Sequence, residues 1–386
     1  MISNSGFIDS YRLKEIFVAS YIVFNFINRD ISNFFLIAVL IICLVDYKNL
    51  IENLRNNKDV VLVVVTFSLW VSVVGYFHSA PWHEMDNYYR FLLLLPLLSI
   101  NFRKDNLETI IILCGVFAVI HFLWSHNDLD SRYQGTSSTS ITYGYLIITI
   151  MLLSANYLFK NNRNIKKIFI HGLICFSLIY IWFMTETRGP IIAFLISIIY
   201  FSITYKNKLF LSILLLFFGS SLFINDNFRA RLFKLSDINI YNANVIDHTS
   251  TRERVAYLHY GIDMLNDRPL LGIGPQNVVS TMRKNFKDIP KNAQIRDHLH
   301  NEYLDISVKF GLPSLIFLIL IYIILYNRIS KTDRTVATII FITLLSSQIT
   351  QSQFAHHQAI SFFIILIYLL TQKNKLEVEH HDINSS

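Results

Sequence analysis

The chain has 386 residues, of which 53% are hydrophobic and 16% are charged, with a mean hydropathy of +0.42 and a net charge of +7. Because soluble domains carry about 25% charged residues, this composition excludes an ordinary soluble protein and indicates a membrane protein. The basic residues fall mainly in short segments between apolar runs, so we expect no nucleic-acid partner. The three cysteines are scattered without CxxC spacing, which predicts neither a zinc site nor disulfide bonds.

Apolar runs long enough to cross about 30 Å of hydrocarbon recur along the chain. Each run must be helical, because backbone groups find no water partners in lipid. We expect about twelve membrane-spanning helices, of which the first, fourth and last are short. Their approximate bounds are 15–27, 31–47, 60–78, 90–100, 107–125, 141–159, 168–184, 191–205, 209–224, 303–326, 335–349 and 359–371.

The expected fold is therefore an all-α polytopic membrane protein with one large outer loop. Residues 1–224 would hold nine spans, residues 225–302 the partly helical loop, residues 303–371 three more spans, and residues 372–386 a polar tail. Lysine and arginine concentrate in alternate short segments, which the positive-inside rule assigns to the cytoplasm. Both termini are thus expected in the cytoplasm. The short outer loops hold only four arginines, Arg29, Arg90, Arg132 and Arg188.

The outer loop contains one predicted helix and one predicted turn. Residues 254–265 place apolar side chains near helical spacing, and the hydroxyls of Thr249, Ser250 and Thr251 are suited to cap the start of that helix. The glycines and proline of residues 271–275 break the pattern and predict a loop.

Arg188 lies in a very short outer turn between two long apolar runs. An arginine at this depth is costly unless it is paired or faces water. It could pair with Glu186 or extend to lipid headgroups. The adjacent Gly189 and Pro190 instead favour a shaped turn that aims the side chain.

Arg252 and Arg254 lie at the start of the predicted 254–265 helix. A helix N-terminus favours anions, and arginine adds bidentate donors that suit phosphate. Each arginine taken alone could be a solvated charge. Acidic residues near Arg90 and Arg132 could likewise be their salt-bridge partners.

A histidine cluster precedes the tenth expected span, where His298 and His300 are followed by Asn301 and Tyr303. With neighbouring carboxylates the two histidines could form a metal site, but they lack the i,i+4 spacing of a helical zinc pair, and we expect no metal. Either one could be an ordinary surface histidine. A general base near neutral pH is the use that imidazole serves best here.

The sequence contains no nucleotide-binding signature and no paired acids in the outer loop for a divalent ion. We therefore expect no cofactor, and a donor substrate that is already activated and lipid-borne. A transporter would place ionisable groups at mid-membrane in broken helices. Because the charges here gather at one surface, an enzyme is the favoured class.

Four blocks of this sequence resemble O-antigen ligases and the related O-antigen polymerases. They are residues 254–274, residues 300–304 with the 310–312 segment, residues 187–189, and residues 132–135. Their order and spacing carry the resemblance. One departure is Leu258, at a position where the family often has tryptophan.

The resemblance implies a GT-C-like glycosyltransferase fold in the bacterial inner membrane, among membrane lipids, with the active site facing the periplasm and without metal or nucleotide. Ligases of the family move O-antigen glycan from undecaprenyl diphosphate to the lipid A–core, and polymerases extend the lipid-linked glycan. His300 would be the catalytic base, with Arg188 and Arg254 as diphosphate ligands. The expected supporting substrate contacts are Arg132, Arg90, Arg252, His298, Asn301 and Tyr303.

Overall fold

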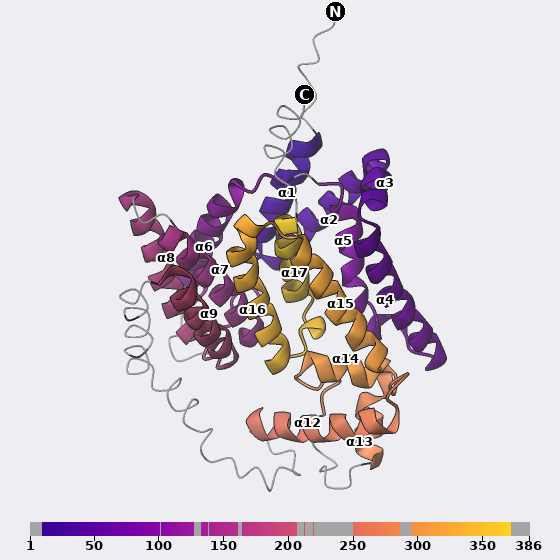
Figure 1. Cartoon of the computed structure of the whole chain (residues 1–386). Coiled ribbons are helices and arrows are strands. Elements are labelled where there is room, and N and C mark those ends of the chain that lie inside the picture. The colour runs from indigo at the N-terminus through magenta and orange to yellow at the C-terminus, as the bar shows by residue number, and fades with distance from the viewer. Residues whose placement is uncertain are drawn as a thin grey trace, which may run out of the picture.

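The computed structural model describes residues 10–100, 102–126, 133–137, 139–160, 164–206, 212, 219, 250–285 and 295–371, and every regular element bounded within them is a helix (Figure 1). The α-helices are α1 (Ser10–Phe24), α2 (Arg29–Val45), α3 (Tyr47–Asn56), α4 (Lys58–Phe77), α5 (Leu94–Leu97), α6 (Asn106–Ser125), α7 (Ser140–Lys160), α8 (Ile165–Met184), α9 (Gly189–Tyr205), α12 (Ser250–Asp267), α13 (Val278–Asn285), α14 (Glu302–Phe310), α15 (Leu312–Arg328), α16 (Arg334–Thr350) and α17 (His357–Thr371). Short 3-10 helices are η1 (Trp82–Glu84), η2 (Tyr88–Leu93), η4 (Pro275–Asn277), η5 (Lys331–Asp333) and η6 (Gln353–Ala355).

The long apolar helices confirm a helical membrane protein. Within the described ranges, α4, α6, α7 and α8 are each long and apolar enough to cross a membrane, and the number rises to six if two bent pairs count as one span each. These pairs are α2 with α3, bent by 88°, and α15 with α16, bent by 109°. The count of twelve spans stays a prediction, because most of 209–224 and all of 372–386 lie outside the described residues.

The prediction of one continuous helix over 303–326 is wrong, because the chain breaks at Gly311 between α14 and α15. Gly311 has φ 80°, and a Cβ atom there would overlap the carbonyl oxygen of Leu270. The next residue, Leu312, donates its N–H to the Pro269 carbonyl at 2.8 Å. The break therefore lets the outer loop pack directly against the bundle.

The predicted fourth span over 90–100 is also not a regular helix. It consists of the 3-10 helix η2 followed by the single turn α5. Pro96 lies inside α5 and cannot donate a backbone hydrogen bond.

Ion pairs link neighbouring helices at one end of the bundle. Near the start of α1, Lys14 donates to the Ser99 carbonyl at 3.5 Å. Near the end of α17, Tyr368 donates to the adjacent Ile100 carbonyl at 3.2 Å, so these two helix ends lie at the same end of the bundle. The arrangement gathers lysines that the positive-inside rule assigns to one side. The pairs are Lys14–Asp46 at 2.6 Å, Lys104–Asp333 at 2.6 Å and Lys167–Glu108 at 2.7 Å.

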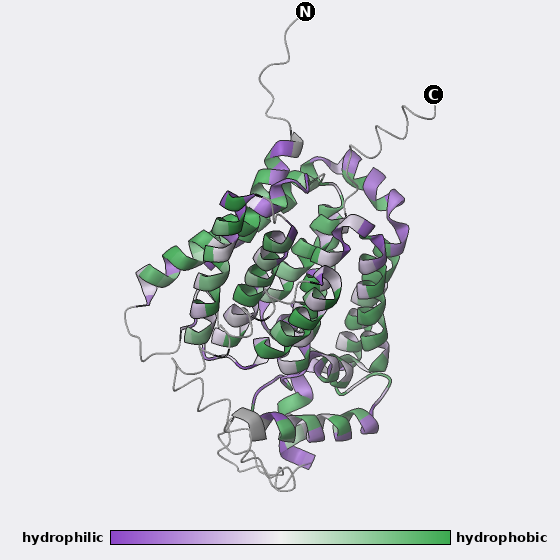
Figure 2. Cartoon of the chain, turned by 60° about the vertical axis from the view of Figure 1, so that its left-hand side comes forward, coloured by the Kyte–Doolittle hydropathy of each residue, from purple (hydrophilic) through white to green (hydrophobic). Residues whose placement is uncertain are grey.

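The opposite end of the bundle carries α12 and α13 (Figure 1), and hydrophilic residues gather toward both ends (Figure 2). One face of α12, formed by Ala256, Tyr257, Tyr260 and Met264, is buried in a small core of its own. The predicted 254–265 helix is thus confirmed and is longer than expected. Its start at Ser250 puts two of the expected capping hydroxyls inside the helix rather than before it.

Candidate active site

The loop before α14 presents His300 at the end of the bundle where α12 lies. His300 has φ 54°, a left-handed conformation that residues other than glycine rarely adopt and that recurs at functional sites. Tyr257 of α12 packs beside it with ring centroids 5.8 Å apart, and the Tyr257 hydroxyl accepts the Arg296 N–H at 2.9 Å. The loop is therefore held against α12.

A buried amide holds the His300 ring. Directly after α16, Gln351 places its Oε1 2.9 Å from Nδ1 of His300 and its Nε2 2.8 Å from Nε2 of His356. With the amide oxygen facing His300, the ring proton stands on Nδ1 and Nε2 keeps its lone pair. No hydrogen bond among the described residues engages that Nε2, so it can accept a proton.

The second predicted histidine, His298, lies edge-on to His300 with ring centroids 4.7 Å apart. Its Nδ1 lies 2.9 Å from Oδ1 of Asp297, and this hydrogen bond lowers the pKa of the Asp297 carboxyl. Within the described part of the chain, no three His, Cys, Asp or Glu side chains are arranged to hold a metal ion. Metal independence stays an expectation from the sequence.

The surroundings of His300 keep its imidazole neutral. Burial is the largest cause that lowers the pKa of His300, and the charges of His298, Arg254 and Arg296 act in the same direction. Together, against the Gln351 hydrogen bond, which raises it, they lower this pKa to about 3. The ring is therefore in its proton-accepting form at neutral pH. A bound anion beside the ring would raise this pKa.

Arg254 lies one helical turn before Tyr257, on the part of α12 that faces the histidine loop. Its charge acts on His300, and it also lies within electrostatic range of the Tyr145 hydroxyl of α7. The charge of Arg254 thus acts both on the predicted base and on a residue of the bundle.

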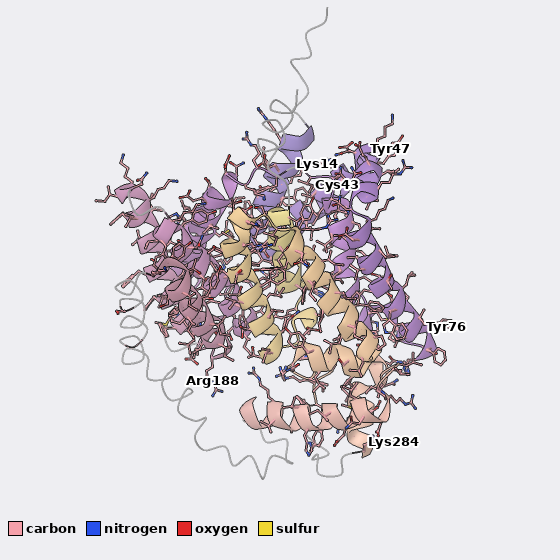
Figure 3. The ribbon with its side chains drawn as sticks, in the orientation of Figure 1. Lys14, Cys43, Tyr47, Tyr76, Arg188 and Lys284 are labelled. Atoms are coloured by element: carbon pink, nitrogen blue, oxygen red, sulfur yellow. The ribbon has the colours of Figure 1, made fainter. Side chains whose placement is uncertain are left out.

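A hydrogen bond from a buried tryptophan holds the turn that carries Arg188. Trp182 donates its ring N–H to the Thr187 carbonyl at 3.2 Å, and Glu186 takes the left-handed conformation with φ 51°. Arg188 itself is the residue that precedes α9. Figure 3 shows it at the end of the bundle where α12 lies.

Close packing brings this turn to the His300 site. A Cβ atom on Gly189 would lie 2.6 Å from the Tyr145 hydroxyl and 2.9 Å from Oγ1 of Thr350. Thr350 is followed directly by Gln351, which holds His300. The backbone at Arg188 therefore lies beside the residues that position the predicted base, and Tyr145 is shared with Arg254.

A buried carboxylate supports the histidine loop from below. Asp305 accepts the Leu299 N–H at 2.9 Å and the Tyr88 hydroxyl at 3.1 Å, and it pairs with Lys309 at 2.9 Å. Because Leu299 adjoins His300, this network fixes the backbone from which the imidazole projects.

Two other predicted residues connect α14 to α16. Asn301 caps α14 by accepting the Leu304 N–H at 3.0 Å, and it donates to the Ile349 carbonyl at 3.2 Å. The Tyr303 hydroxyl lies 3.5 Å from the Leu345 carbonyl. These contacts are structural, and a role in substrate binding for either residue stays a prediction.

Of the remaining predicted arginines, the structure describes only the side chain of Arg90, and it lies in another part of the bundle surface from His300. Arg90 donates to Oγ of Ser361 at 3.0 Å and lines a separate cavity together with His357. Arg132 and the side chain of Arg252 lie outside the described residues.

Two of the sequence blocks that carry the resemblance pack on each other. Ile273 donates its N–H to the Val308 carbonyl at 2.8 Å, and Gly274 donates to the Lys309 carbonyl at 3.1 Å. The predicted glycine loop is thus paired with the end of α14.

Residues 173–319, from within α8 to within α15, match the family model described as O-antigen ligase. Over this segment, the chain is similar to O-antigen ligases. The predicted resemblance is confirmed over these residues, and the apolar helices are those of a multi-pass membrane protein. No curated protein matches it.

The O-antigen ligase segment contains Arg188, Arg254 and His300 but ends before Gln351 and His356. Sequence reasoning missed these last two residues. The only signal for them was a short polar run at the mouth of apolar helices, without any motif to connect it to the histidine cluster.

Proposed function

We propose that this chain is an O-antigen ligase that transfers glycan from undecaprenyl diphosphate to the lipid A–core on the periplasmic face of the inner membrane. The observation that carries the proposal is that His300 is neutral, is held by the buried amide of Gln351, and lies within electrostatic range of Arg254. A base beside a fixed cation is the pairing that glycosyl transfer from a diphosphate requires.

In the proposed reaction, an acceptor sugar hydroxyl attacks the anomeric carbon from the face opposite the diphosphate. His300 takes the hydroxyl proton on Nε2 as the new C–O bond forms. The bond from the anomeric carbon to the diphosphate oxygen breaks, and that oxygen keeps the electron pair. Arg188 and Arg254 neutralise the charge that develops on undecaprenyl diphosphate. A single displacement inverts the anomeric centre.

The proposed reaction needs no nucleotide, because the lipid diphosphate already activates the sugar. Two guanidinium groups provide charge neutralisation that other transferases obtain from a divalent ion. Protonation of His300 also fits this scheme, because the leaving diphosphate brings negative charge that raises the pKa of the ring.

The test is transfer by His300→Ala, Arg254→Ala and Arg188→Lys in a deletion strain, read on lipopolysaccharide gels at equal protein levels. General-base and electrostatic groups each contribute about 10²–10⁴-fold, so each variant should leave the core almost uncapped. Arg188→Lys keeps the charge but loses the bidentate fork. Normal capping by the His300 and Arg254 variants would defeat the proposal.

The same gel separates ligase from polymerase. A deletion strain that accumulates long glycan on undecaprenyl diphosphate and leaves the core bare supports a ligase. A core capped with single repeats would assign the chain to the polymerases of the same family instead.

A further inference from the structure

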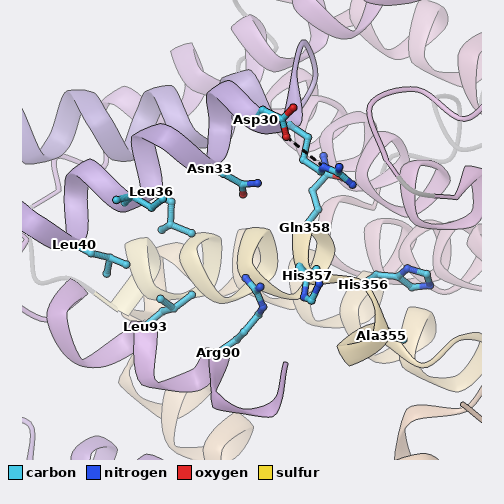
Figure 4. Close-up of a pocket in the computed structure, with 12 residues that line it drawn as sticks. Asp30, Asn33, Leu36, Leu40, Arg90, Leu93, Ala355, His356, His357 and Gln358 are labelled. Atoms are coloured by element: carbon cyan, nitrogen blue, oxygen red, sulfur yellow. Dashed lines mark ion pairs between the residues drawn. The ribbon is translucent and has the colours of Figure 1, made fainter. Parts of the chain in front are cut away.

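A second site lies beside the candidate active site, in a cavity of about 760 Å³ between α2, η2 and the start of α17 (Figure 4). One end of the cavity is cationic, with Arg29 and Arg90, and His357 lies beside them. The other end is apolar, with Leu36 and Leu40. Its volume lies within the range of about 300–1,000 Å³ that is usual for ligand pockets.

One face of α2 lines the cavity from end to end. Arg29, Asn33, Leu36 and Leu40 follow one another at spacings of four, three and four residues, which places them on the same side of a helix. At a rise of 1.5 Å per residue, Leu40 lies about 16 Å further along α2 than Arg29. Asp46, beyond the far end of α2, belongs to the ion-pair end of the bundle. The cationic end of the cavity is thus the end near His300, and the leucines lie at membrane depth.

Arg90 is held in place by one hydrogen bond and still has an unused donor. It donates to Oγ of Ser361 at 3.0 Å, and its buried Nε has no hydrogen-bond partner among the described residues. The carboxylate that lines the cavity, Asp30, is 86% exposed and reaches Arg29 only at 3.9 Å. A fixed guanidinium with an unmet donor favours an anionic ligand.

The cavity adjoins the active site without merging with it. His356 forms part of the cavity wall, and its ring is hydrogen-bonded to Gln351, which holds His300. Arg254 acts electrostatically on His300, whereas the arginines of the cavity act on His357. The cavity and the His300 site are thus linked through His356 and Gln351.

Glycan transfer between two lipid-anchored substrates needs two anchors in the membrane at once, and this step rests on the proposed function. The Arg188 and Arg254 group serves the donor diphosphate. We propose that the cavity binds the phosphorylated anchor of the acceptor lipid, with a phosphate at Arg29 and Arg90 and the adjoining hydrocarbon along Leu36 and Leu40. The anchor is thereby kept in a cavity that is linked to the proposed base through His356 and Gln351.

The test compares acceptors with and without phosphate on purified full-length protein in lipid nanodiscs. The donor is undecaprenyl-diphosphate-linked glycan, and the acceptors are lipid A–core and the same lipid with its lipid A phosphates removed. Arg90→Gln and Arg29→Gln should each raise the KM for the phosphorylated acceptor about tenfold and leave the donor KM within about twofold, since tenfold corresponds to one lost charge-assisted contact. Lys284→Gln, which removes an exposed cation of α13, is the matched control.

Removing the acceptor phosphates should weaken the wild type as much as Arg90→Gln does, and it should have no further effect on that variant. The inference would be overturned if phosphate removal raised the acceptor KM equally in the wild type and in Arg90→Gln, or if the variants changed the donor KM alone. Native mass spectrometry of the same samples should show retention of the phosphorylated acceptor by the wild type and its loss in Arg90→Gln. Retention of ordinary phospholipid in place of the acceptor would also overturn it.

This binding measurement separates the inference from the proposed function. If the wild type retains the phosphorylated acceptor but transfers nothing to it, the proposed ligase activity fails while the lipid site stands. If transfer occurs and phosphate has no effect on KM, the lipid site fails while the activity stands.

Discussion

At His300, a left-handed backbone and one buried amide decide how the imidazole is presented. The backbone conformation turns the side chain back toward the end of α16, where Oε1 of Gln351 meets Nδ1 at 2.9 Å. A histidine without this partner would exchange freely between its two neutral tautomers. The amide therefore does for His300 what a carboxylate or carbonyl does for many catalytic histidines.

Replacing Gln351 tests this positioning role. Gln351→Leu should lower kcat at least about tenfold, because half or more of the rings would no longer hold the lone pair on Nε2 and the ring would lose its orientation. Gln348→Leu is the control, since it removes another buried amide close by, one that donates to the Tyr322 hydroxyl at 2.6 Å. Equal loss of kcat in both variants would mean that general packing, and not the tautomer, is responsible.

The pH dependence of transfer follows from the same surroundings. Burial and the neighbouring charges together lower the pKa of His300 to about 3, so kcat/KM should not fall with the midpoint of about 6.5 that an ordinary histidine gives. In Gln351→Glu the carboxylate would favour the imidazolium and raise the pKa, and the acid limb should move to higher pH. A wild-type midpoint near 6.5, unmoved in Gln351→Glu, would contradict this assignment.

The effect of His300 on the pH dependence of the free energy of unfolding is opposite to that of a histidine paired with a carboxylate, because folding lowers the pKa of His300 instead of raising it. Because the folded state disfavours the charged ring, the unfolded chain binds more protons at acid pH. The contribution of His300 to the free energy of unfolding is full above about pH 6.5 and declines as the pH falls below that value.

Among the elements, the ends of α9 and α16 show how separate helices build the site. α9 begins at Gly189, directly after Arg188, and its first turn lies against Tyr145 of α7 and Thr350 of α16. Tyr145 and Thr350 are joined by a hydrogen bond of 2.5 Å between their hydroxyls. A side chain at position 189 would have to displace this pair.

Gly189→Ala should therefore shift Arg188 away from Gln351 and reduce transfer severalfold or more, at a level of folded protein close to normal. Gly172→Ala on α8 is the matched control, because its Cβ atom would meet only Leu158 at 3.7 Å, an ordinary contact. Transfer and thermal unfolding in detergent should both be measured. Full activity of Gly189→Ala would show that the position of Arg188 does not depend on this contact.

The α14 helix serves the site in another way, through charges that it buries. Asp305 and Lys309 pair across one turn at 2.9 Å, and Asp305 also accepts the Leu299 N–H. Burying such a pair contributes little net stability, but leaving one member unpaired is costly. The pair is thus best understood as fixing the loop that precedes α14.

For the whole molecule, the two ends of the bundle are chemically distinct. One end carries interhelical lysine–carboxylate pairs, and the other carries α12 on its own small core, the His300 loop and the cationic end of the cavity. Figure 3 shows Tyr47 and Lys284 at these opposite ends. The positive-inside rule predicts that the first end is cytoplasmic.

Cysteine labelling in intact cells checks this orientation. A membrane-impermeant maleimide should label Lys284→Cys in spheroplasts and should label Tyr47→Cys only after the membrane is opened. Tyr47 is 56% exposed, and the three native cysteines are buried, so the background should be low. Labelling of Tyr47→Cys alone in closed spheroplasts would reverse the topology and place the proposed site in the cytoplasm.

Much of this architecture was accessible from the order of residues, because hydropathy and charge are local properties. Apolar runs predicted the helices over 60–78, 107–125, 141–159 and 168–184 close to their observed bounds, and residue chemistry alone singled out His300 and the outer arginines. Those features depend on what lies within a few positions along the chain.

Other features depend on which distant segments meet. Gln351 is 51 residues from His300, and the cavity is formed by α2, η2 and α17. No sequence pattern within one segment could therefore predict the contact between Gln351 and His300 or the cavity. The break at Gly311 likewise requires the Leu270 backbone to lie against it. Hydrogen-bond partners and cavity walls are set by packing in three dimensions. For this reason, the role of Gln351 beside His300 and the cavity at Arg29 and Arg90 could be found only in the folded chain.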